Sequence, residues 1–407
     1  MRTPRRVLFV THNVPRAPGD AAGSFVLRLA VALQLGGIRV DIVAPGAPDV
    51  PETDWIEGVR ITRVAYASPS RMTLAYEGTM AEKVRHSWGA RWALLQLLLA
   101  LRRATGEALE QARREDDPYG ALHVHWWFPA GLALWRLRAT RGMPRVLTMH
   151  GSDVRLASGI PVSHPVMRTV LRDMTHRAVV SHWMAAAVSR MARDLPVEVA
   201  PMPIDLAQFT PPPAGAPREG ILFVGRLNAQ KGVADLLRAA AHPALRAAAH
   251  PALRAVPITI VGDGPDATAL RELAATQHLG DRVTWLPAVP HGHLSTLYRR
   301  AALVCMPSRS EGLGLVAVEA QACGTPVVGY ADGGLLDVVQ TGPGRGRLVA
   351  AGSVEALAEA MASVLGEAAA AERLALRDAM LDRFAPARVA AGYAAMYAMN
   401  LGPGEAA

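Results

Sequence analysis

The chain has 407 residues and a formal net charge of +8, and 51% of its residues are hydrophobic and 19% charged. This length predicts two domains, and the apolar content excludes a disordered or fibrous chain. Two cysteines, Cys305 and Cys323, are too few for a disulfide framework or a cysteine-based metal site. No apolar run approaches the roughly 18 residues of a membrane span, and the run 7–10 is too short for a signal peptide. We therefore expect a soluble, cytoplasmic protein.

The positive charge comes almost entirely from arginine, because only Lys83 and Lys231 among the 43 basic residues are lysines. The arginines are scattered along the chain and do not cluster as a nucleic-acid-binding surface requires. We expect no nucleic-acid partner. The charge instead favours anionic substrates or an anionic membrane surface.

Short apolar runs alternate with helical stretches from end to end, which predicts an α/β protein with parallel sheets covered by helices. A helix is predicted over 23–36, because Phe25, Leu29 and Leu33 fall on one helical face. The strands predicted in the first half are 6–11, 39–44, 121–125 and 145–149.

The segment 83–103 shows apolar residues at helical spacing: Val84, Trp88, Trp92, Leu95 and Leu99. Neighbouring leucines widen this apolar face, which favours a core helix of the first domain. The alternative is a helix that rests on an anionic membrane surface, with its tryptophans at the interface and its basic residues around them.

Proline-rich stretches at 200–203 and 211–213 cannot continue a strand or a helix, so they mark a connection between domains. We expect an amino-terminal Rossmann-like domain over 1–203 that binds the acceptor, a second one over 204–385 that binds the donor, and a helix of about 386–407 that packs back on the first. The two domains would face each other across a cleft, with ligands at the carboxyl ends of the strands. The strands predicted in the second half are 221–225, 258–262, 282–286, 303–306, 327–330 and 347–349.

The most informative segment is PSRSEGLGLVAVEAQACGTPVVGY, residues 307–330. A glycine-containing loop follows a predicted strand and opens a helix near Leu315, where unpaired backbone N–H groups suit a phosphate. Glu311 and Glu319 flank this anion site, and their carboxylates can accept hydrogen bonds from sugar and ribose hydroxyls.

Three further segments follow predicted strands. VGRLNAQKG (224–232) brings Arg226 and Lys231 to a strand end and the next helix start, where two cations can converge on a diphosphate. IVGDGP (260–265) contains Gly262, but tight turns also use glycine for structural reasons alone. TMHGSD (148–153) places His150 and Asp153 after a strand of the first domain.

Taken together and in this order, the segments resemble the retaining, nucleotide-sugar-dependent glycosyltransferases of family 4, which have the GT-B fold. The family's hallmark is a pair of glutamates separated by seven residues, which here are Glu311 and Glu319. HWWFPAG (125–131) and PMPID (201–205) also occur in the family's order. The resemblance therefore covers nearly the whole chain.

The resemblance implies a retaining hexosyltransferase that moves a sugar from a nucleotide-diphosphate donor, with UDP or GDP, to a hydroxyl acceptor. The resemblance also implies that the enzyme needs no metal and no cofactor. His150 would contact the sugar from the opposite domain, and the base would lie near 286–289. The donor-binding residues that the resemblance implies are Arg226 and Lys231 for the diphosphate, Glu319 for the ribose, and Glu311 with the backbone of Gly312, Leu313, Gly314 and Leu315 for the sugar.

One departure concerns the loop after the first strand, where family members commonly carry a Gly-Gly pair. This chain has Gly19 and Asp20 there, so a negative charge lies near the expected diphosphate. Asp20 would alternatively face the acceptor and orient its hydroxyl. Gly19, Asp20, Asp153 and Gly262 are therefore candidate loop contacts to substrate.

Two alternatives to the transferase stay open: a sugar-nucleotide epimerase on the same fold and a non-catalytic nucleotide-binding protein. A phosphorylase is disfavoured, because its pyridoxal cofactor needs a lysine and the chain has only two. The acceptor would be a polysaccharide, a glycolipid or a small metabolite. We expect a role in cell-envelope or polysaccharide biosynthesis, in the cytoplasm or at the inner face of the membrane.

Overall fold

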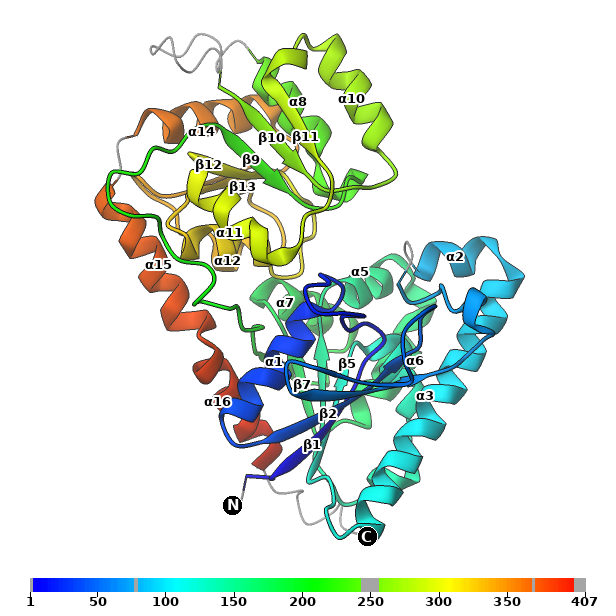
Figure 1. Ribbon diagram of the computed structural model, residues 1–407. Helices are drawn as coiled ribbons and strands as arrows, with labels where there is room; N and C mark the ends of the chain where they lie inside the picture. The colour runs from blue at the N-terminus through cyan, green and yellow to red at the C-terminus, as the bar shows by residue number, and fades with distance from the viewer. Residues whose placement is uncertain (1–2, 77–79, 243–255, 368–369, 399–407) are drawn as a thin grey trace. The chain divides into compact units, whose positions relative to one another are not determined.

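The computed structural model describes residues 3–76, 80–242, 256–367 and 370–398 (Figure 1). Most of the tandem repeat AAAHPALR, residues 239–246 and 247–254, lies outside these ranges. The chain divides into two compact units, and each is described separately below. Unit 1 contains Met1–Pro203 and Pro386–Ala407, and unit 2 contains Ile204–Ala385.

Unit 1 is built on an eight-stranded sheet with the order β3-β4-β2-β1-β5-β6-β7-β8. All neighbouring strands are parallel except the β3–β4 pair, which is antiparallel. The central strands are buried on both faces, which explains why they appear in the sequence as continuous apolar runs. The strands are β1 Arg6–Val10, β2 Arg39–Pro45, β3 Thr53–Ile56, β4 Val59–Val64, β5 Ala121–His125, β6 Arg145–Met149, β7 His176–Val179 and β8 Glu198–Val199.

Helices cover both faces of this sheet, with α1 and α16 on one side and α3 on the other (Figure 1). The α-helices of unit 1 are α1 Ser24–Leu35, α2 Met80–His86, α3 Trp88–Arg114, α4 Leu132–Leu134, α5 Ser152–Gly159, α6 His164–Arg172, α7 His182–Met191 and α16 Pro386–Ala398. Short helical turns lie at η1 Pro69–Arg71, η2 Trp127–Gly131, η3 Arg138–Thr140 and η4 Pro161–Ser163.

The carboxy-terminal helix α16 completes unit 1 from the far end of the chain. It packs against α1 and β6. The hydroxyl of Tyr397 lies 2.7 Å from Nδ1 of the buried His123, and Tyr393 donates a hydrogen bond of 2.9 Å to the carbonyl of Ala200. These polar contacts fix the position of α16 on the unit.

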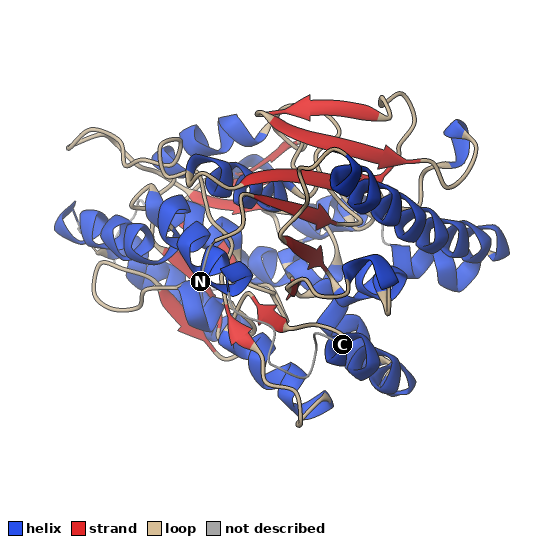
Figure 2. Ribbon diagram, turned by 90° about the horizontal axis from the view of Figure 1, so that it is seen from below, coloured by secondary structure: helices blue, strands red, loops and turns tan. Residues whose placement is uncertain are grey.

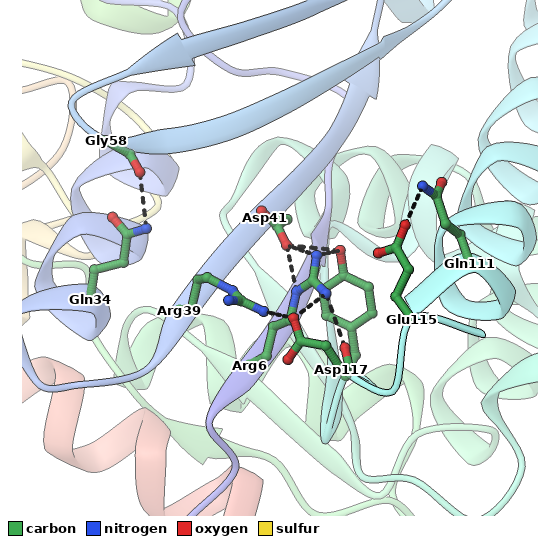
Figure 3. A network of polar contacts seen from close by, with 9 residues as sticks. Arg6, Gln34, Arg39, Asp41, Gly58, Gln111, Glu115 and Asp117 are labelled. Atoms are coloured by element: carbon green, nitrogen blue, oxygen red, sulfur yellow. Dashed lines mark hydrogen bonds and ion pairs between the residues drawn. The ribbon is translucent and has the colours of Figure 1, made fainter. Parts of the chain in front are cut away.

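A partly buried ionic network joins the amino-terminal ends of β1 and β2 (Figure 3). Arg6 donates to the Asp41 carboxylate (2.8 Å), to Asp117 (2.9 Å) and to the hydroxyl of Tyr119 (3.0 Å). Tyr119 in turn donates to Asp41 (2.8 Å), and Arg39 pairs with Asp117. Because ligands of such folds bind at the carboxyl ends of the strands, this network has a structural role.

Unit 2 is built on a six-stranded parallel sheet with the order β11-β10-β9-β12-β13-β14. Figure 2 shows the strands in red and the helices in blue. Its strands are β9 Ile221–Val224, β10 Ile258–Val261, β11 Val283–Leu286, β12 Leu303–Met306, β13 Val327–Tyr330 and β14 Arg347–Val349. Its helices are α8 Val233–Ala241, α10 Ala267–Thr276, α11 His291–Arg300, α12 Leu315–Ala322, α13 Leu335–Val338, α14 Val354–Gly366 and α15 Ala370–Phe384, with short turns η5 Ala229–Lys231 and η7 Gly280–Arg282.

The α/β prediction is confirmed, and each predicted strand is present to within one residue at either end. The prediction of a core helix over 83–103 is confirmed only in part, because the segment is not one helix and the predicted apolar face is not the buried one. The side chain of Ser87 accepts a hydrogen bond from the N–H of Ala90 and starts a new helix, so the segment is divided between α2 and α3. The face that includes Trp88 and Trp92 is exposed, whereas Leu97 and Leu101 on the opposite face are buried. Among the described helices, none combines the length and apolar character needed to cross a bilayer.

Candidate functional site

The loops that follow β9 and β12 of unit 2 meet through an ion pair. Lys231 Nζ lies 2.7 Å from the Glu311 carboxylate, and these side chains are only 21% and 16% exposed. Asn228 accepts a hydrogen bond from the backbone N–H of Lys231 and fixes the turn that carries the lysine. Two residues that the sequence predicted for donor binding, 80 positions apart, are therefore in direct contact.

Backbone packing holds these two loops together. Gly232 adopts a positive φ of 68°, and a Cβ there would overlap the carbonyl oxygen of Pro307. The N–H of Arg309 donates to the carbonyl of Gln230 at 2.9 Å. Gly232, the last residue of the VGRLNAQKG motif, is therefore required by close packing between two strand-end loops.

The loop 311–314 is supported by a glycine pair that sequence reasoning missed. A Cβ on Gly333 would overlap the backbone of Glu311, and a Cβ on Gly334 would overlap that of Gly312. The N–H of Gly334 also donates to the carbonyl of Glu311 at 2.7 Å. The only sequence signal was the GG dipeptide shortly after the strand 327–330.

Helix α12 begins after Gly314, which has a φ of 87° and provides no side-chain cap. The first N–H groups of a helix have no partner within the helix and carry a partial positive charge. Leu315 is the first residue of α12, as the sequence predicted. Gly312, Leu313, Gly314 and Leu315 thus form the loop and helix start beside Glu311, an arrangement that suits an anion.

Glu319 lies inside α12 and is almost completely buried, with 3% of its surface exposed. One carboxylate oxygen lies 2.8 Å from Nε2 of His291, and the other accepts a hydrogen bond of 3.1 Å from the hydroxyl of Tyr298. These contacts hold the carboxylate in one orientation. His291 and Tyr298, both on α11, were not singled out from the sequence.

Two other predicted donor-site residues differ in their surroundings. Arg226 follows β9 and its side chain is exposed. Gly262 has a φ of 136°, and a Cβ there would overlap the carbonyl oxygen of Gly225. Close packing of the loops after β9 and β10 therefore explains this glycine. Next to it, Asp263 accepts a hydrogen bond of 2.9 Å from the N–H of Ala288, within the segment 286–289.

In unit 1, His150 lies in a cluster of histidines and aromatic rings. Its Nε2 is 3.0 Å from Nδ1 of His125, and its ring packs on Phe25 and Trp126. Burial lowers the pKa of His150 well below its usual range, and the neighbouring His125 and His12 lower it further by smaller amounts. The imidazole is therefore neutral near pH 7 and can both donate and accept a hydrogen bond.

Asp153 organises the backbone around His150. One carboxylate oxygen accepts hydrogen bonds from the N–H groups of His150 and Gly151, both 3.2 Å, and the other from the N–H of Trp127, 3.1 Å. Burial raises the pKa of Asp153 to about 6, although these backbone hydrogen bonds act in the opposite direction. This geometry makes Asp153 a positioning residue for the two loops.

Three polar atoms beside this cluster are buried without a hydrogen-bond partner among the described residues. They are His12 Nδ1, Asn13 Oδ1 and His125 Nε2. Burial lowers the pKa of His12 to about 4 and that of His125 to about 3, so both rings are neutral near pH 7. Buried polar atoms are nearly always paired, so these three indicate a place for water or the hydroxyls of a ligand. No motif in the sequence singled them out.

The loop after β1 contains Gly19 and Asp20. Gly19 has a φ of 83° and open space around it. Asp20 accepts hydrogen bonds from the side chain of Arg16 (2.7 Å) and the N–H of Ala22 (3.1 Å). Burial raises the pKa of Asp20, but the Arg16 hydrogen bond and backbone N–H groups outweigh it and hold that pKa below its usual range. The charge of Asp20 is thus balanced within its own loop.

Arg63, at the carboxyl end of β4, is a further residue that sequence reasoning missed. It is 3% exposed, and one guanidinium nitrogen donates to the carbonyl of Pro15 at 2.7 Å. Its Nε and Nη1 are buried and have no hydrogen-bond partner in the part of the chain that the structure describes. A buried guanidinium with unsatisfied donors is suited to an anionic group.

Among the described residues, no group of three or more His, Cys, Asp or Glu side chains has a metal-binding arrangement.

Comparison with known proteins relates both units to sugar transfer. Residues 22–208 match the family model described as Glycosyltransferase Family 4, and residues 210–377 match Glycosyl transferases group 1. The D-inositol 3-phosphate glycosyltransferase of Mycobacteroides abscessus is 33% identical over 366 residues, which cover 82% of this chain and 75% of the relative. The chain belongs to glycosyltransferase family 4. It is a glycosyltransferase that uses a nucleotide-sugar donor.

A second relative supports the family, and two solved structures support the fold. The D-inositol 3-phosphate glycosyltransferase of Mycolicibacterium gilvum is 32% identical, over 94% of this chain and 86% of its own. Sucrose-phosphate synthase from Thermosynechococcus elongatus has a TM-score of 0.75 at 23% identity, covering 97% of this chain and 98% of its own. Anabaena HepE in complex with UDP and glucose has a TM-score of 0.66 at 16% identity, covering 96% and 98%. The glycosyltransferase therefore has the GT-B fold.

Proposed function

We propose that this glycosyltransferase transfers a hexose from a nucleoside-diphosphate sugar to a hydroxyl group, with retention of the anomeric configuration and without a metal. The observation that carries the proposal is the Lys231–Glu311 ion pair beside the uncapped start of α12. A departing nucleoside diphosphate develops negative charge, and preorganised cations and helix-start N–H groups stabilise charge where it develops.

The residues of unit 2 divide into three roles. Lys231 and Arg226 neutralise the diphosphate, and the N–H groups from Gly312 to Leu315 donate to the transferred sugar and to the charge that develops beside it. Glu311 accepts hydrogen bonds from the sugar, and Glu319 accepts them from the ribose hydroxyls.

For the base of the donor we favour uracil, because Anabaena HepE, a structural neighbour, was solved in complex with UDP and glucose. A cytoplasmic location for the enzyme stays a prediction.

The predicted contact of His150 with the transferred sugar also stays a prediction. Its neutral imidazole suits a hydroxyl group, which it can meet as donor or acceptor.

For the acceptor we favour a polyol that carries an anionic group over a neutral polysaccharide. The relatives are named for inositol 3-phosphate, and Arg63 of unit 1 offers two unsatisfied N–H donors in a buried setting. A phosphate accepts such donors strongly. The unpaired atoms of His12, Asn13 and His125 offer partners for hydroxyl groups in the same unit.

A thermal-shift panel followed by product analysis tests the proposal. UDP, GDP, ADP and dTDP are added separately, and a ligand at 100 times its Kd stabilises the fold by about 2.7 kcal/mol. NMR of the product from an α-linked donor is expected to show an α-linkage. An inverted linkage contradicts retention, an isomerised donor without transfer supports an epimerase, and binding without turnover supports a non-catalytic protein.

The acceptor assignment predicts a selective defect in Arg63→Met. We expect KM for inositol 3-phosphate to rise at least tenfold, with an unchanged UDP-induced thermal shift, because the anion would lose its buried partner. Stability is expected to change little, since the substitution preserves volume and removes a partly unpaired charge. Initial-rate kinetics measure the effect, with Arg71→Met, an exposed arginine, as the matched control. An unchanged KM in Arg63→Met argues against the anionic acceptor.

A further inference from the structure

Helix α3 has two apolar faces, and only one of them is buried. Leu97 and Leu101 are buried on the face turned to the sheet. Within an arc of about 60° on the opposite face lie four exposed apolar residues, which we call the α3 stripe. Their exposed fractions are 81% for Trp88, 63% for Trp92, 44% for Leu95 and 53% for Leu99.

An exposed stripe of this kind needs an explanation. Single exposed apolar residues are common on protein surfaces, but a continuous apolar patch marks an interaction site. Helix propensity is no reason for two tryptophans here, since leucine or alanine favours helix more. The stripe therefore points to a partner that accepts apolar and indole side chains.

The charges around the α3 stripe are predominantly positive. Residues 80–103 contain five lysine and arginine residues and a single acidic one, Glu82. Arg85, Arg91 and Arg103 are exposed, and Arg103 also pairs with Glu107, the next acidic residue along α3, at 2.8 Å. The guanidinium of Arg91 lies 4.4 Å from the ring centroid of Trp88 and also donates to the last carbonyls of α2, so it holds the tryptophan beside a positive charge.

Two grooves in unit 1 border α2 and combine apolar walls with basic rims. One, of about 840 Å³, is lined by apolar residues such as Val84, Leu94 and Phe128, and also by Arg85, His86 and the acidic Glu82. The other, of about 810 Å³, includes Trp92 of the α3 stripe together with Lys83 and Arg71. Grooves with an apolar interior and cationic edges match lipid molecules, which have acyl chains and phosphate headgroups.

We propose that the α2–α3 face of unit 1 binds the surface of an anionic membrane. The indole rings of Trp88 and Trp92 lie at the depth of the headgroups, as tryptophans do at membrane interfaces. Leu95 and Leu99 enter the acyl boundary, and Arg85, Arg91 and Arg103 contact lipid phosphates. The concentration of positive charge around the stripe favours an anionic lipid surface over an apolar groove on a protein.

Vesicle flotation tests this proposal with the full-length protein. Vesicles contain phosphatidylcholine alone or phosphatidylcholine with roughly 40% phosphatidylglycerol. We expect binding to the anionic vesicles only, and binding that weakens as salt is raised. The double variant Trp88→Ser/Trp92→Ser is expected to bind at least tenfold more weakly. Arg85→Gln/Arg103→Gln is expected to lose roughly fivefold for each charge removed.

The matched control is Trp55→Ser, which removes another exposed tryptophan of unit 1, at 64% exposure, on strand β3. Its flotation should equal that of the unaltered protein. Sugar transfer in an assay without vesicles needs both units, so equal rates in all variants show that unit 1 is still folded.

Three results would overturn the proposal. In the first, the unaltered protein does not float with anionic vesicles. In the second, Trp88→Ser/Trp92→Ser floats as well as the unaltered protein. In the third, the unaltered protein does not bind vesicles but forms a dimer in light scattering, and the double variant abolishes that dimer. The last result would assign the α3 stripe to contact between two copies of the chain.

Discussion

Replacing Lys231 by alanine is expected to lower kcat/KM for sugar transfer on the order of 10²–10³-fold, the loss typical when one preorganised charge-stabilising donor is removed. The substitution also leaves the Glu311 carboxylate, 16% exposed, without its cation at 2.7 Å. The diphosphate would then meet an unbalanced negative charge. Initial rates of donor consumption measure the effect, and the UDP-induced thermal shift should shrink with them.

The chain offers a natural control for this substitution, because Lys83 is the only other lysine. In an assay without vesicles, Lys83→Ala should retain full activity. Lys231→Arg keeps the positive charge but changes the geometry of the hydrogen-bond donors on the side chain. It should therefore be more active than Lys231→Ala and less active than the unaltered protein. If Lys231→Ala transfers sugar at the unaltered rate, the diphosphate role of this lysine is wrong.

The second large effect is expected from Glu319→Gln. The substitution removes the charge of a carboxylate that His291 and Tyr298 hold in place, and with it the charged acceptor proposed for the ribose. A hydrogen bond to a charged group contributes about 1.5–3 kcal/mol, so the Kd for UDP should rise by about 10–150-fold. Isothermal titration calorimetry gives this value directly.

The ligand supplies the control in this case. The Kd of 2′,3′-dideoxyuridine diphosphate, which lacks both ribose hydroxyls, should be nearly the same for the Glu319→Gln variant and the unaltered protein. If both ligands lose affinity equally, Glu319 maintains the fold of α12 and does not contact ribose. Tyr298→Phe removes one hydrogen bond to Glu319 without changing its charge, and should show a smaller loss for UDP.

Central strands could be predicted from the sequence because their burial on both faces produces continuous apolar runs. β1 and β5 are examples. The hairpin β3–β4 was missed because its exposed and buried residues alternate, and because it contains charged side chains. β7 and β8 were missed because they are short and partly exposed, so burial leaves little signal in their composition.

The candidate site was predicted only where one local segment carries it. Lys231 and Glu311 were selected from separate motifs and are in contact. Gly333 and Gly334 could not be selected, because their constraint is the backbone of a loop about twenty residues earlier in the chain. Similarly, the period of α3 identifies two apolar faces but cannot say which of them the sheet covers. Only the tertiary packing of Leu97 and Leu101 decides it.

The position of α16 has a consequence for biosynthesis. Its tyrosines complete the surroundings of His123 and Ala200, yet all of unit 2 is translated before it. At about 5–20 residues per second, the ribosome needs roughly 10–40 s to make the intervening segment. During that time the surface of α1 and β6 that α16 covers stays exposed, while unit 2 can already fold. The half of the protein that is made first therefore completes its folding last.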